Sequence, residues 1–163
     1  MRRDRRVWWI VLLALVAVLA ALSAGSLVIF VHEKDSIFET VFRYQMDHLV
    51  ATHSSEKVNA YFLCTDDKDP STALLRRLRG RVPPVKRYSE CTQEEQGMIV
   101  RDRQTGQRGV ILDVSELHWL SPHRVEVAAA DIRNGTDAYG SRITLERTLG
   151  RWHVTAEHLE WVS

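Results

Sequence analysis

Cysteine and proline are scarce in this chain of 163 residues, which contains two of the former and four of the latter. No C-x-x-C or C-x-x-H pair is present to begin a closed zinc site. The glycine-rich patterns that cradle phosphates and the motifs of catalytic triads are absent as well. From these absences we expect no metal, no cofactor and no catalytic activity.

Charge is absent from a long segment near the N-terminus. Residues 7–31 contain no ionisable side chain, and this run of about 25 residues exceeds the roughly 20 that cross a bilayer as a helix. The arginines that precede it favour a cytoplasmic N-terminus by the positive-inside rule. We therefore predict a basic cytoplasmic N-terminus (1–6), a transmembrane signal-anchor helix in the lipid bilayer (7–31) and an extracytoplasmic domain (32–163).

A cleavable signal peptide is the alternative for the same segment. Small residues between Ala21 and Ser26 offer imperfect cleavage sites, and cleavage would release a secreted soluble domain. The apolar run resumes over residues 27–31, however, which favours a retained anchor. Both interpretations place the remaining residues outside the cytoplasm.

Composition narrows the location and the partners further. Arginine far outnumbers lysine, as in proteins from GC-rich bacterial genomes, so we expect a single-pass protein of the bacterial inner membrane with a periplasmic or extracellular C-terminal domain. The net charge of +1 depends on residues 1–6, in which four arginines outweigh Asp4, and the rest of the chain carries about −2. We therefore expect no nucleic-acid partner.

The two cysteines, Cys64 and Cys91, are predicted to form one disulfide, as is usual for a small exported domain. Closing a loop of about 28 residues contributes roughly 3.5 kcal/mol on the chain-entropy model. The aspartates that follow Cys64 would raise the pKa of its thiol, which argues against a nucleophilic cysteine.

Hydrophobic spacing and turn residues outline the elements of the domain. We expect a helix over residues 35–54 with a capping box at Ser36 and Glu39, a strand over 57–64, and a short helix over 70–79 with Asp69 as its N-cap. From Gly97 onward, turn signals divide an antiparallel meander of five strands. Changes in side-chain parity predict bulges near Ser115 and near Glu157.

The order of these elements resembles a known fold. The helix FETVFRYQMDHL, the hairpin ITLERTLGRWHV and the terminal strand EHLEWVS are similar to the cystatin-like roll of the nuclear-transport-factor-2-like and ketosteroid-isomerase-like superfamily. The resemblance implies an α+β fold in which one or two helices pack on a bent antiparallel sheet, here behind the transmembrane helix. A single anchor before such a roll also resembles inner-membrane scaffold subunits of type IV secretion systems, by analogy of architecture alone.

Enzymes of that superfamily enclose a conical pocket in which an acid or a histidine transfers protons, so the resemblance supplies pocket candidates. They are Tyr44, Asp47, His48, Tyr61, His118 and Trp119. A general base needs burial or a partner to tune its pKa, and the sequence shows neither. Tyr44 and Tyr61 are also typical of aromatic residues at the edge of a core.

Histidines and tryptophans on the predicted strands suggest two other sites. A metal site would need His118, His123, His153 and His158 to converge, but strand parity points His118 and His158 toward solvent. The tryptophans at 119, 152 and 161 alternate with aliphatic residues, which favours a core role over a ligand-stacking surface.

The sequence therefore predicts a membrane-anchored extracytoplasmic interaction or assembly module without catalytic activity. Its partner would be another protein or a second copy of the chain, because exposed sheet edges favour pairing. The alternative is a pocketed roll that binds or converts a small apolar ligand.

Overall fold

The computed structural model describes residues 33–49, 58–93 and 98–163. The chain divides into two compact units, Met1–Lys34 and Asp35–Ser163, and nearly all described residues belong to the second. The predicted cytoplasmic N-terminus (1–6) and transmembrane helix (7–31) lie outside the described residues. Among the residues that are described, no helix is long and apolar enough to cross a membrane.

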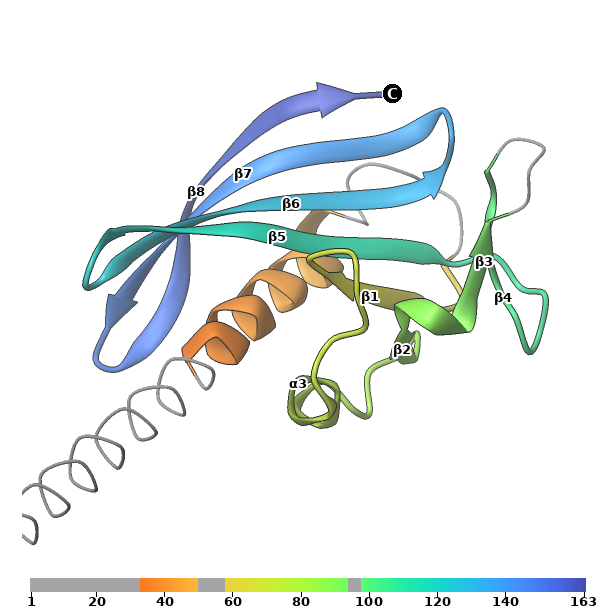
Figure 1. Ribbon diagram of the computed structural model, residues 1–163, viewed down its shortest axis with the longest axis horizontal. Helices are drawn as coiled ribbons and strands as arrows, with labels where there is room; N and C mark the ends of the chain where they lie inside the picture. The colour runs from red at the N-terminus through yellow and green to blue at the C-terminus, as the bar shows by residue number, and fades with distance from the viewer. Residues whose placement is uncertain (1–32, 50–57, 94–97) are drawn as a thin grey trace, which may run out of the picture. The chain divides into compact units, whose positions relative to one another are not determined.

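A six-stranded mixed sheet forms the centre of the second unit (Figure 1). Its strands lie in the order β2, β1, β5, β6, β7, β8. Strand β1 runs parallel to both of its neighbours, whereas β5 to β8 form an antiparallel meander. The strands are β1 (Tyr61–Thr65), β2 (Val85–Arg87), β5 (Val110–Ser121), β6 (Arg124–Asn134), β7 (Asp137–Thr148) and β8 (Arg151–Val162).

One face of this sheet packs against a helix to form the main core. The helix covers residues 33–44 and continues as a π-helical turn, η1 (Gln45–Leu49). Its residues Ile37, Phe38, Val41 and Phe42 are buried, at a spacing that places them on one side of a helix. They pack with alternate residues of the long strands and with Trp152 of β8, which fill the space between helix and sheet.

The opposite face of the sheet is covered at one end by a small hairpin. Strands β3 (Cys91–Gln93) and β4 (Val100–Asp102) pair in an antiparallel way, and the 3-10 turn η2 (Tyr88–Glu90) precedes them. Phe62 and Ile111 of the large sheet pack here with Val100 and both cysteines. Ile132 of β6 also packs against this second cluster.

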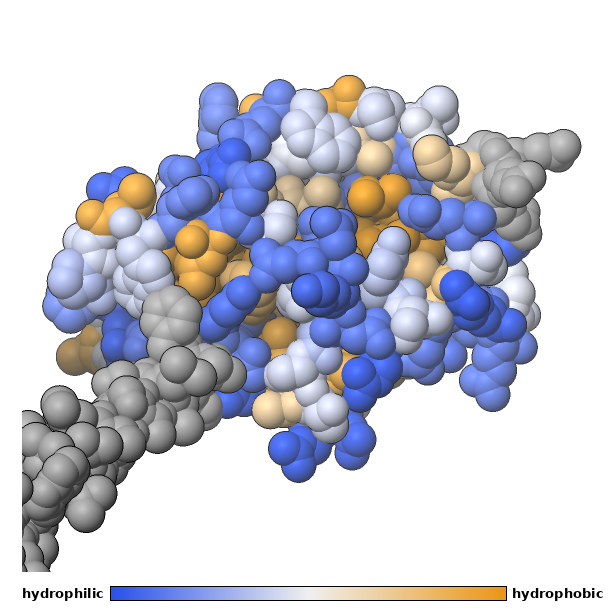
Figure 2. All heavy atoms as spheres, in the orientation of Figure 1, coloured by the Kyte–Doolittle hydropathy of each residue, from blue (hydrophilic) through white to orange (hydrophobic). Residues whose placement is uncertain are grey.

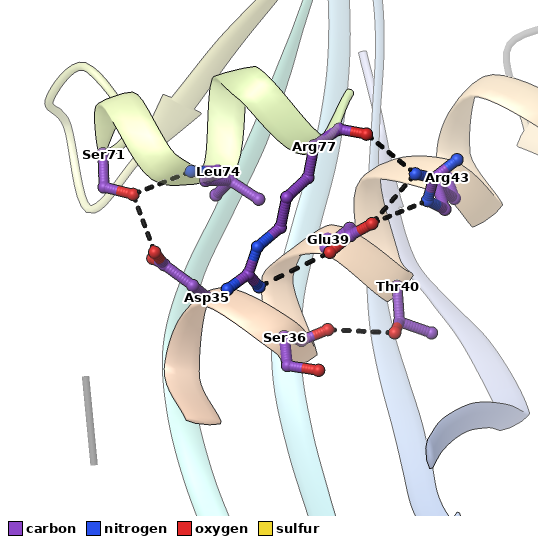
Figure 3. A network of polar contacts seen from close by, with 8 residues as sticks. All are labelled: Asp35, Ser36, Glu39, Thr40, Arg43, Ser71, Leu74 and Arg77. Carbon is purple, nitrogen blue, oxygen red and sulfur yellow. Dashed lines mark hydrogen bonds and ion pairs between the residues drawn. The ribbon is translucent and has the colours of Figure 1, made fainter. Parts of the chain in front are cut away.

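The helix α3 (Thr72–Arg77) connects β1 to β2 and contacts the first helix (Figure 3). Ser71 caps α3, because its Oγ accepts a hydrogen bond of 3.0 Å from the Leu74 amide and donates one of 2.7 Å to Asp35. Asp69 is not the N-cap that we predicted, since its carboxylate accepts two hydrogen bonds from Ser89 instead.

Three charged side chains add to this contact between the two helices (Figure 3). Glu39 accepts a hydrogen bond of 2.9 Å from Arg43 and lies 3.5 Å from a guanidinium nitrogen of Arg77. Arg43 also donates to the carbonyl oxygen of Arg77. Glu39 therefore acts in this network and not in the predicted capping box, because the helix already includes residues 33 and 34.

The predicted fold class, in which a roll of one or two helices on a bent antiparallel sheet follows a transmembrane helix, is wrong for the residues that the structure describes. Strand is the main element of the described residues, the helices among them are short, and the sheet is mixed because β1 lies parallel to β2 and β5. Local patterns indicated the strand of β1 but neither its partners nor its direction, because those partners lie far along the chain. The segment that we expected to begin the meander, β4, pairs with β3 instead.

Bulges bend the long strands, partly as predicted. The register between β5 and β6 shifts between Ser115 and His118, which confirms the first predicted bulge. Glu116 has a φ of 52° at this point. The second prediction is wrong in position: β8 shifts register against β7 on either side of Glu157, at Thr155 and at Glu160.

Candidate functional site

The end of the first helix brings three of the six pocket candidates together. Tyr44 and His48 stack with ring centroids 4.9 Å apart and planes at 19°, and Asp47 precedes His48 in the π-helical turn. Such π-helical turns are frequent at functional sites. The side chains of Asp47 and His48 are exposed, so this group forms a surface and not the floor of a pocket.

Tyr44 connects this group to the last strand. Its hydroxyl donates a hydrogen bond of 2.9 Å to one carboxylate oxygen of Glu157, and the hydroxyl of Ser141 donates one of 2.8 Å to the other. Burial and then the nearby Glu157 carboxylate raise the pKa of Tyr44. At neutral pH the phenol is therefore protonated, and it acts as a hydrogen-bond donor that holds β8 to the helix.

Asp47 is paired with Arg81, a residue that the sequence did not single out. The guanidinium donates two hydrogen bonds to the carboxylate, of 2.5 and 2.9 Å. The hydrogen bond from Arg81 lowers the pKa of Asp47 despite partial burial, so this carboxylate is a poor proton acceptor near neutral pH. Tyr61, in β1, lies near this pair, and burial raises its pKa.

The structure gives the other two candidates different surroundings. His118 lies on β5 opposite Glu126 and is exposed. Trp119 packs edge-to-face on Trp152, with ring centroids 5.7 Å apart, and is 40% exposed. Of the three tryptophans for which the sequence favours a core role, Trp152 is buried, whereas Trp119 is partly exposed and Trp161 is 46% exposed.

Cys64 and Cys91 lie in the same buried cluster between the large sheet and the small hairpin. Both are free thiols in the structure, and the disulfide between them stays a prediction. Burial, followed by the nearby Asp113 carboxyl, raises the pKa of Cys64, and burial raises the pKa of Cys91 to about 11. As thiols, both are protonated at neutral pH and poor nucleophiles.

A cavity of about 150 Å³ lies on the face of the sheet away from the helix. Its lining residues, which include none of the six candidates, are Asp113, Ser115, Ala128, Ala129, Ala130, Ser141, Glu160 and Trp161. Small residues create the hollow: three alanines in β6 lie beside Gly140, on which the indole of Trp161 packs so closely that an added Cβ would lie 2.1 Å from it. This volume holds about five water molecules.

Asp113 and Glu160 are the charged side chains in the lining of this cavity. Burial raises the pKa of Asp113, and the hydrogen bond from Cys64 opposes this only in part. Glu160 forms an ion pair of 3.1 Å with Arg142. The run of alanines at 128–130 was the only signal of the cavity in the sequence, and it does not reveal that Trp161 forms a wall.

Metal ligands do not gather in the parts of the chain that the structure describes, where no group of three or more His, Cys, Asp or Glu side chains is placed to hold an ion. No protein-family model, curated protein or solved structure matches this chain. The resemblance to the nuclear-transport-factor-2-like superfamily stays a prediction.

Proposed function

We propose that this protein is a membrane-anchored, extracytoplasmic interaction module of the bacterial inner membrane, without catalytic activity. Its apolar segment (7–31) holds the chain in the bilayer with the N-terminus in the cytoplasm. Its sheet domain associates with a second copy of the chain. The free edge of β8 is the observation that carries this proposal.

Strand β8 is the last of the six strands, so one of its sides has no neighbouring strand among the residues that the structure describes. It is 12 residues long, and most of its side chains are exposed. Leu159 and Val162 are 50% and 56% exposed on one face of its C-terminal half, and Trp161 is 46% exposed on the other. A long edge with apolar side chains on both faces is suited to pairing with another strand.

A second copy of β8 is the simplest occupant of this edge. Two identical edge strands pair in an antiparallel way about a twofold axis, so that each copy presents the same residues. The bulges at Thr155 and Glu160 limit regular pairing to the stretch between them and to the strand ends. The paired stretch therefore includes Leu159, which would become buried on association.

The site geometry favours this function over the alternative of a small apolar ligand. The core between helix and sheet is filled by Phe38, Phe42 and Trp152. The cavity on the other face is smaller than the roughly 300–1,000 Å³ of typical ligand pockets, and acidic side chains line part of it. The paired Asp47 and the protonated Tyr44 support a structural role for the helix end.

Light scattering on the full-length protein in detergent micelles tests the association. We expect a dimer for the natural chain and a monomer for Leu159→Lys, since a buried unpaired charge opposes pairing. Val82→Lys is the matched control, because Val82 is 95% exposed just before β2, at the opposite edge of the sheet. A natural chain that stays monomeric at high concentration, or a dimeric Leu159→Lys variant, would contradict the proposal.

A further inference from the structure

The turn between β7 and β8 contains a leucine that neither the backbone nor burial accounts for. Leu149 has a φ of 51° and Gly150 one of 78°, so both central residues of this two-residue turn are left-handed. Turns of this kind prefer Asn or Gly at the first position, because a branched side chain is strained there. The side chain of Leu149 is nevertheless 99% exposed.

The neighbouring hairpin turn, between β5 and β6, also presents large apolar side chains. Trp119 is 40% exposed and Leu120 is 53% exposed at the end of β5. The two turns lie side by side, because the amide of Arg147 donates a hydrogen bond of 2.8 Å to the carbonyl oxygen of His123. Figure 2 shows apolar side chains among the polar ones at the surface of this end of the sheet.

Positive charge surrounds these apolar residues. Arg124, Arg147 and Arg151 flank the two turns in β6, β7 and β8 and are exposed, as is His123. Glu146 lies 3.7 Å from Arg124. We call this set, Trp119, Leu120, Leu149, Arg124, Arg147 and Arg151, the hairpin end. It combines aliphatic and indole side chains with an excess of arginine, as membrane-interface surfaces do.

The hairpin end lies where the chain enters the domain. Figure 1 shows that the N-terminal end of the described helix (33–44) lies at the end of the sheet where both hairpins turn. Residue 33, the first described residue of this helix, follows two positions after residue 31, the last of the apolar run. In a chain held in the bilayer through residues 7–31, this short connection limits how far residue 33 can lie from the lipid surface.

We propose that the hairpin end docks on a phospholipid surface that carries anionic headgroups, with Leu149 inserted between the headgroups. This inference rests on the proposed membrane anchor. The arginines contact lipid phosphates, and Trp119 lies at the level of the headgroups, where indole rings are favoured. Docking fixes the orientation of the domain, so that the free edge of β8 faces sideways, toward a second copy in the same membrane.

A fluorescent probe beside the leucine tests this docking in the full-length protein. Thr148→Cys provides an exposed attachment point for the probe and leaves Leu149 intact. The natural chain, treated with the same probe, shows how much signal comes from labelling of the two buried cysteines. The labelled chain is placed in vesicles of phosphatidylcholine and phosphatidylglycerol. We expect quenching by lipids with a nitroxide near the headgroup and protection from iodide in the water.

Leu149→Asn in the same labelled protein removes the inserted side chain. Asparagine accepts a left-handed backbone, so this variant keeps the turn and tests the contact without a folding defect. We expect the ratio of docked to undocked domains to fall about tenfold, with a corresponding loss of lipid quenching. Val82→Asn is the matched control, because Val82 is 95% exposed elsewhere in the chain, and it should leave the quenching unchanged.

Flotation of the same vesicles after a carbonate wash separates this inference from the anchor. If the protein floats but iodide quenches the probe equally in the labelled protein with Leu149 and in its Leu149→Asn variant, the docking is wrong and the anchor stands. Equal losses with Val82→Asn and Leu149→Asn would also overturn the docking. If the protein does not float, the anchor is wrong and the docking falls with it.

Discussion

Replacing Asp102 by asparagine should destabilise the domain by about 2 kcal/mol, the range of a hydrogen bond to a charged group. Asp102, in β4, lies 2.6 Å from the ammonium of Lys86 in β2, and these side chains are only 5% and 20% exposed. It also accepts hydrogen bonds from the amides of Gln104 and Thr105. Asparagine keeps an oxygen that accepts from the amides but loses the charge that pairs with Lys86. The decrease in the free energy of unfolding therefore measures the ion pair.

The pH dependence of this loss has a definite sign. Burial alone would raise the pKa of Asp102, but the hydrogen bonds from Lys86 and from the two amides outweigh it and lower the pKa in the folded state. The stabilisation that charged Asp102 provides is therefore fully present above the pKa of an aspartate in the unfolded chain, about 3.9. It is lost as the pH falls through the lower pKa that Asp102 has in the folded state. The difference between natural and Asp102→Asn proteins should be constant from about pH 7 to pH 5 and shrink below about pH 4.

Urea unfolding of the full-length protein in detergent, followed by circular dichroism, measures this difference. A double-mutant cycle with Lys86→Met isolates the pair, and we expect a coupling of about 1–2 kcal/mol because one partner is slightly exposed. A coupling within about 0.3 kcal/mol of zero, or a loss that persists unchanged at about pH 3, would refute the reasoning.

Three further predictions concern the core, the cavity and the cysteines. Phe42→Ala, at a side chain with no exposed surface, should cost about 3–5 kcal/mol in the same unfolding assay, and a cost below about 1 kcal/mol would show that the core is not filled. Gly140→Ala should displace the indole of Trp161, visible as a shift of its N–H resonance in NMR spectra, while an unchanged resonance would contradict the close contact. Intact mass after alkylation should show two added groups, on Cys64 and Cys91, only when the protein is reduced and denatured first; two groups without reduction would rule out the predicted disulfide.

The long strands were predictable because their pattern is local. In β6, side chains alternate between buried and less buried positions, so Val125, Val127 and Ala129 share the core face as strand periodicity requires. The first bulge could be located because the apolar residues on one face of β5 occupy even positions up to Val114, whereas Leu117 and Trp119 occupy odd positions. One extra residue between them keeps all of these side chains on the same face. Helix spacing similarly indicated the buried side of the first helix.

Features that depend on distant partners could not be predicted. The pairing of β1 with β5 joins Tyr61 to Val110, and no local pattern specifies a parallel neighbour so far along the chain. Arg81 follows the short helix as an unremarkable basic residue, yet the fold brings it to Asp47. The cap of α3 was assigned to Asp69 because that residue precedes a proline, but its carboxylate is occupied by Ser89 and Ser71 takes its place.

The most direct measurement of the central proposal is protease accessibility in intact spheroplasts of a bacterium that expresses the full-length chain. We expect an external protease to digest the domain after residue 32, while the cytoplasmic N-terminus and a cytoplasmic marker protein stay intact and the remaining fragment stays with the membrane. A domain that is digested only after the spheroplasts are lysed would contradict the extracytoplasmic location, and a chain released into the soluble fraction would contradict the anchor.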